Sequence, residues 1–130
     1  MSKNRLSKHP RTVTDERARE IVGVLLTHFG PMESYKLLNL SLLMANDISR
    51  RCIAGIDVRR VTKNAGLGQF GWRHLVCEML IDGLIENVGE TTTLKVVMPH
   101  CIDGDDAERI REIEMIPPRF AIGLGLRSGD

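Results

Sequence analysis

The sequence predicts one mainly helical domain that carries a small β-hairpin. Its 130 residues are typical of a single domain with its own core. Apolar residues recur at helical spacing over three long stretches. Two short runs rich in β-branched residues follow the third stretch, and the Gly89-Glu90 pair between them predicts a turn. Together these observations indicate helices first and a hairpin near the end of the domain.

The first stretch predicts a helix from Thr14 to Phe29. Thr14 provides an N-terminal cap, and Asp15 and Glu16 lie favourably at the positive end of the helix dipole. Gly30 directly follows the last apolar residue, as is common where helices end.

The second stretch predicts a helix from about Glu33 to Arg50, whose wide apolar surface includes Tyr35. If one small domain cannot cover all the apolar residues of the first two helices, a symmetric homodimer interface should hide the remainder. The residues concerned are Ile21, Leu25, Leu42 and Leu43.

Shorter elements follow these two helices. Residues 52–56 predict a short strand, and Asp57 is placed to cap a short helix from Val58 to Ala65. The third long stretch predicts a helix from about Gly71 to Gly83. Its inward positions are Trp72, Leu75, Val76, Met79 and Leu80.

The last predicted elements are a hairpin and a charged helix. The hairpin strands are expected at Leu84–Val88 and Thr91–Met98, and the helix at Asp105–Met115. The acidic run that begins at Asp103 is typical of a helix N-terminus. Its spacing does not fit a calcium-binding loop.

Charge divides the chain into regions with different roles. Residues 1–13 lack apolar periodicity and acids, so they predict a flexible basic arm. The domain is expected to span residues 14–115, and residues 116–130 are expected to form a C-terminal tail. The basic residues of the arm are Lys3, Arg5, Lys8 and Arg11. A second basic segment at 57–75 precedes an acidic remainder, although the whole chain carries only +1.

Composition excludes several classes of protein. Aromatic residues make up 4% of the chain, too few for the stacking platform of single-strand binders. The three cysteines are widely spaced and odd in number, which indicates a reducing compartment, and we expect the cytoplasm. The apolar run at 37–44 is too short and too interrupted to span a membrane.

Two phrases carry a resemblance to a known family. Val61-Thr62-Lys63-Asn64-Ala65-Gly66-Leu67 looks like a short helix that ends in Ala-Gly-Leu, and Met79 to Glu86 looks like the exit of a recognition helix into a wing. In this order of elements, the sequence resembles the winged helix-turn-helix superfamily of DNA-binding domains. The resemblance implies a winged helix with additional N- and C-terminal helices, which are surplus to the minimal domain.

The resemblance also implies roles for particular residues. The helix from Gly71 would enter the major groove of duplex DNA with Gln69, Arg73 and His74 near base edges. The preceding helix would meet phosphates, and the arm would follow a groove. The expected phosphate-contacting residues are Arg59, Arg60, Lys63, Lys3 and Arg5. The hairpin tip has no arginine, so it would either bond phosphate through its hydroxyls or stay away from DNA.

Metal binding and catalysis find little support in the sequence. His74, Cys77, His100 and Cys101 could supply four ligands, but adjacent ligands fit tetrahedral zinc poorly and no Cys-x-x-Cys pair exists. The glycines at 66, 68 and 71 predict turns rather than a dinucleotide-binding loop. We therefore expect no enzyme, no metal and no cofactor.

The sequence thus predicts a small DNA-binding transcriptional regulator, bacterial or carried on a mobile element, that acts as a homodimer on double-stranded DNA. A protein-interaction module is the alternative. It would have the same fold, and its acidic C-terminal half would bind a basic partner such as polymerase or a second regulator subunit. A third possibility is a role in replication or plasmid maintenance.

Overall fold

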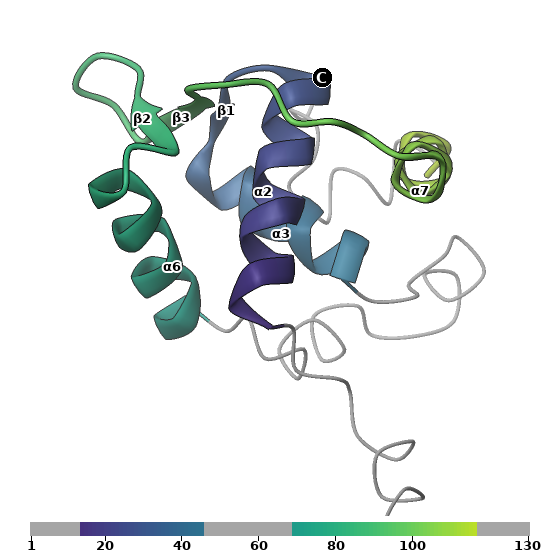
Figure 1. Ribbon diagram of the computed structural model, residues 1–130, viewed down its shortest axis with the longest axis horizontal. Coiled ribbons are helices and arrows are strands. Elements are labelled where there is room, and N and C mark those ends of the chain that lie inside the picture. Colours follow the sequence, from purple (N-terminus) through teal and green to yellow (C-terminus); the bar gives the residue numbers. More distant parts are fainter. Residues whose placement is uncertain (1–13, 46–68, 117–130) are drawn as a thin grey trace, which may run out of the picture.

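The computed structural model describes residues 14–45 and 69–116, which form four helices and a three-stranded antiparallel sheet (Figure 1). The order along the chain is α2, β1, α3, α6, β2, β3, α7. No helix in these two ranges is long and apolar enough to cross a membrane.

Helix α2 spans Asp15–Phe29 and confirms the first predicted helix. The Thr14 hydroxyl accepts a hydrogen bond from the Arg17 amide at 3.1 Å, which satisfies one of the free donors of the first turn. Gly30 ends the helix at φ 86°, and its amide donates to the Leu26 carbonyl. Helix α2 packs on α3, α6 and β3, so it is central to the core. Whether it is surplus to a minimal winged-helix domain stays a prediction.

The sheet has the order β1-β3-β2. Strands β2 (Ile85–Asn87) and β3 (Thr93–Val96) form the predicted hairpin, although both are shorter than expected. Strand β1 (Met32–Glu33) pairs with the far side of β3. It was not predicted, because two residues between a helix end and a helix start carry no periodic signal.

Helix α3 spans Ser34–Ala45 and begins where β1 ends. Three predicted elements lie outside the described residues. They are the remainder of the second helix, the strand at 52–56 and the helix at Val58–Ala65. The expectation for Tyr35 is wrong, because its side chain is 64% exposed instead of lying on the apolar surface.

Helix α6 spans Gln69–Ile81. It begins two residues before the predicted start at Gly71 and ends two residues before Gly83, which adopts φ 77° and carries the chain toward β2. The predicted inward face is confirmed. Trp72, Leu75 and Met79 are buried, and Val76 and Leu80 are partly buried against the core.

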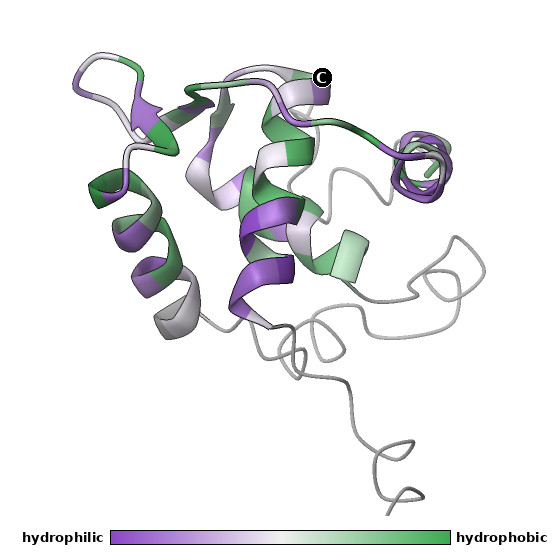
Figure 2. Ribbon diagram, viewed as in Figure 1, coloured by the Kyte–Doolittle hydropathy of each residue, from purple (hydrophilic) through white to green (hydrophobic). Residues whose placement is uncertain are grey.

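The core is formed by α2, α3, the inner face of the sheet, and one face each of α6 and α7. Figure 2 colours the hydrophilic residues of these elements purple. The core encloses all four apolar residues that a homodimer interface was expected to hide, and none of them is more than 5% exposed. They are Ile21, Leu25, Leu42 and Leu43. The premise of the predicted dimer interface on the first two helices is therefore wrong.

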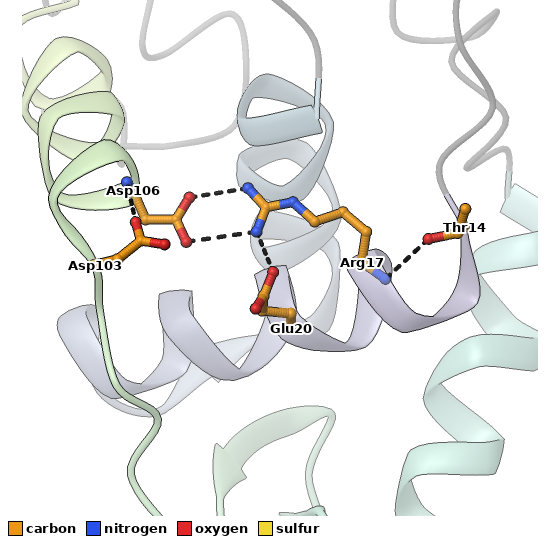
Figure 3. A network of polar contacts seen from close by, with 5 residues as sticks. All are labelled: Thr14, Arg17, Glu20, Asp103 and Asp106. Atoms are coloured by element: carbon orange, nitrogen blue, oxygen red, sulfur yellow. Dashed lines mark hydrogen bonds and ion pairs between the residues drawn. The ribbon is translucent and has the colours of Figure 1, made fainter.

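Helix α7 spans Gly104–Glu114, and the Asp103 carboxylate caps it by accepting a hydrogen bond from the Asp106 amide. This confirms the predicted helix and its acidic N-terminus. The Asp106 side chain is 8% exposed and accepts a hydrogen bond of 2.9 Å from Arg17 of α2 (Figure 3). This bond raises the pKa of the Arg17 guanidinium, and the ion pair links α7 to α2.

Candidate functional site

The outward face of α6 carries the predicted base-reading residues. Arg73, His74 and Cys77 are exposed, and they lie on the side of the helix opposite the buried Trp72 and Met79. Among the described residues, Arg73 has no hydrogen-bond or ion-pair partner. A guanidinium in this position keeps all its donors available for a ligand. Gln69 is the first residue of α6, but its side chain lies outside what the structure describes.

The other predicted contacts fall outside the described ranges. Arg59, Arg60 and Lys63 precede α6, and Lys3 and Arg5 precede α2. The structure therefore brings Arg73 and His74 together and leaves these five residues as predictions.

Two acids, Glu78 in α6 and Asp82 directly after it, pair with an arginine of α2. Arg19 of α2 donates to Asp82 at 2.8 Å and to Glu78 at 3.3 Å. These carboxylates, Asp82 foremost, raise the pKa of the Arg19 guanidinium. Glu78 also lies 3.2 Å from Nε2 of His74, one turn earlier. Both carboxylates thus pair with Arg19, and Glu78 also contacts His74.

The N-terminal end of α3 lies beside α6. The Trp72 indole nitrogen donates to the Ser34 hydroxyl at 3.1 Å. A shallow open cleft at this junction is lined by Ser34, Trp72, Arg73, His74, Val76 and Cys77. The exposed Tyr35 directly follows Ser34 along the chain. Sequence reasoning assigned no role to this end of α3, because the two helices are far apart in sequence.

The hairpin tip has no free hydroxyl at its two central threonines. Thr91 donates to the Val88 carbonyl at 2.6 Å and accepts from the Thr93 amide, and Thr92 donates to a Glu33 carboxylate oxygen at 3.3 Å. Each donor already has a partner in the fold. A phosphate contact through either hydroxyl would require its hydrogen bond within the fold to break.

Charge is distributed very unevenly between the described residues and the rest of the chain. The described ranges contain seven lysines and arginines against fourteen aspartates and glutamates, whereas the whole chain has 18 against 17. Arg73 is thus an exposed cation in a part of the chain where acids outnumber basic residues. Half of the 18 basic residues lie in residues 1–13 and 46–68.

The candidate metal ligands do not assemble within the described part of the chain. No group of three or more His, Cys, Asp or Glu side chains there could hold a metal ion. His100 packs its ring over Gly23 of α2, while His74 and Cys77 lie on the exposed face of α6.

Comparisons of the chain with protein-family models, curated proteins and solved structures found no match. The site must therefore be interpreted from its own geometry and chemistry.

Proposed function

We propose that this protein is a double-stranded DNA-binding transcriptional regulator with a winged helix-turn-helix fold, in which α6 is the recognition helix and β2 and β3 form the wing. The resemblance in the sequence supports this assignment, because that family places a recognition helix directly before a hairpin. Helix α6 passes into β2 through Gly83, and β1 pairs along the far side of β3. The observation that carries the proposal is Arg73, an unpaired arginine on the exposed face of this helix.

In this account α6 lies in the major groove and Arg73 forms paired hydrogen bonds with a guanine edge. His74 lies beside it and is 70% exposed. The segments that contain Lys3, Arg5, Arg59, Arg60 and Lys63 contact phosphates. Because the described body is acidic, DNA is repelled from most of its surface, and the basic segments determine which face approaches.

The experiment is a salt titration of binding to random duplex DNA, followed by selection of preferred sequences from a random library. Affinity should fall steeply with salt, because each neutralised phosphate releases counterions. Selection should recover a short G-containing motif. Absence of salt-dependent binding to any duplex would exclude the proposal.

A two-fold homodimer remains part of the proposal, since one module covers few base pairs and paired modules read two half-sites. Its interface is not the apolar face of the first two helices, which the fold buries. Light scattering of the DNA complex and the spacing of the selected half-sites test this assembly.

The outer face of the hairpin favours protein interaction as a second candidate function. Leu84 and Val97 are joined by a backbone hydrogen bond of 3.0 Å, and both side chains are exposed. Ile81, at the end of α6, is 83% exposed. Exposed apolar residues near one another are typical of protein-binding surfaces. If Val97→Lys left DNA binding intact but abolished regulation in cells, the hairpin face would be a partner surface.

A further inference from the structure

Ser34 joins three elements of the candidate site. Its amide donates to the Thr92 carbonyl at 3.1 Å, which ties the start of α3 to the hairpin loop. Its hydroxyl accepts a hydrogen bond from the Trp72 indole at 3.1 Å, which ties the same residue to α6. Ser34 thus connects the hairpin loop to Trp72, the residue that directly precedes Arg73.

The indole contact fixes α6 at a sensitive position. Trp72 is 4% exposed and directly precedes Arg73, so the seating of its ring determines where the Arg73 side chain leaves the helix. A buried indole N–H needs an acceptor, and Ser34 supplies the one found within the described residues. Without this acceptor, the indole would lose the hydrogen bond that holds the ring in its position.

We propose that Ser34 is a positioning residue that sets the orientation of α6 relative to the hairpin, and thereby the specificity with which Arg73 meets DNA. The DNA part of this inference rests on the proposed function, whereas the Ser34–Trp72 contact does not. Ser34 carries no charge and contributes nothing to the attraction between protein and phosphate. Its removal changes discrimination between sequences and leaves the salt dependence of binding unchanged.

The chain offers a matched control on the same helix. The Ser41 hydroxyl is buried in α3 and has no hydrogen-bond partner within the described residues. Ser41→Ala therefore removes a hydroxyl from α3 without breaking a contact with α6. Ser34→Thr retains a hydroxyl at the joint and serves as the rescue variant.

The first measurement uses the full chain without DNA. Trp72 is the single tryptophan, so one indole N–H resonance reports on the joint in an NMR spectrum. In Ser34→Ala this resonance should shift upfield and its hydrogen exchange should become about tenfold faster, because its acceptor is lost. Ser34→Thr and Ser41→Ala should leave it close to its original position. An unchanged resonance in Ser34→Ala would overturn the inference.

The second measurement compares affinities for the selected duplex and for random duplex. Ser34→Ala should reduce the ratio of the two by about threefold to tenfold with an unaltered salt slope, and Ser34→Thr should restore it. If the indole responds but the ratio does not, Ser34 supports the fold and does not position α6 for DNA. If the unsubstituted protein binds no duplex, the proposed function and the DNA role of Ser34 both fail, and the indole data still decide whether the joint exists.

Discussion

Helices α2 and α6 both carry arginines, partly exposed on α2 and exposed on α6, but the fold uses them in opposite ways. Arg17 and Arg19 of α2 bind acids of α7 and α6, so their charge is satisfied within the molecule. Arg73 of α6 has no such partner among the described residues, and it stands on the helix that leads into the hairpin. Helix α2 thus holds the domain together, whereas α6 is the helix that contacts DNA in the proposed function. Substitutions on α2 should therefore affect stability, and substitutions on α6 should affect binding.

The largest expected effect is at Gly23, in the middle of α2. A Cβ atom built there lies 2.2 Å from atoms of the His100 ring, so Gly23→Ala must displace this ring. The better helix propensity of alanine offsets only about 1 kcal/mol of the strain. We expect a net loss of about 2–3 kcal/mol in the free energy of unfolding, measured by urea denaturation.

Two further variants show whether the His100 ring is responsible. Gly104→Ala places a methyl group in open space at the start of α7 and should be nearly neutral. The double variant Gly23→Ala, His100→Ala should recover part of the lost stability. If the double variant lost as much free energy of unfolding as Gly23→Ala and His100→Ala together, or more, the packing of His100 against Gly23 would not explain the loss.

A smaller loss is expected where α2 meets α7. Asp106→Asn removes the charge that pairs with Arg17, and we expect a cost of about 1–2 kcal/mol. The cost is limited because the Arg17 side chain is 40% exposed and remains hydrated. Asp105→Asn removes the same charge from the same helical turn but breaks no ion pair in the described structure. A similar cost for the two variants, measured by denaturation, would show that helix-dipole effects, not the ion pair, stabilise α7.

The smallest effect is predicted for the basic segment before α6. Arg60→Ala should weaken binding to preferred and random duplexes alike by about 0.5–1 kcal/mol, and it should reduce the salt slope by roughly one. Fluorescence anisotropy at several salt concentrations measures both quantities. Arg111→Ala on α7 is the control, since Arg111 is exposed on an acidic helix far along the chain from α6. A larger change of slope in the control would show that α7, and not the segment before α6, contacts phosphates.

Sequence periodicity was sufficient for the elements whose signals are local. The Thr14 cap, the inward face of α6 and the charged helix α7 were predicted because capping residues and apolar spacing act within a few turns. Strand β1 was missed and Tyr35 was placed wrongly, because both depend on contacts with β3 and on the way the chain turns at Ser34.

The candidate site was predictable only in part for the same reason. The exposure of Arg73 follows from helical periodicity, and it was expected. The contact between Ser34 and Trp72 joins residues 38 positions apart, and the ion pairs of Arg19 cross between helices. Such contacts are properties of packing and leave no periodic trace in the sequence.

The most direct test of the account is the effect of Arg73→Ala on discrimination between DNA sequences. On the selected duplex this variant should lose about 1–3 kcal/mol of binding free energy, and on random duplex much less, because the guanine contact exists only where guanine is present. The free energy of unfolding should change by less than about 0.5 kcal/mol, since the side chain is exposed. Equal losses on both duplexes, with an unchanged fold, would contradict the claim that the exposed face of α6 recognises bases.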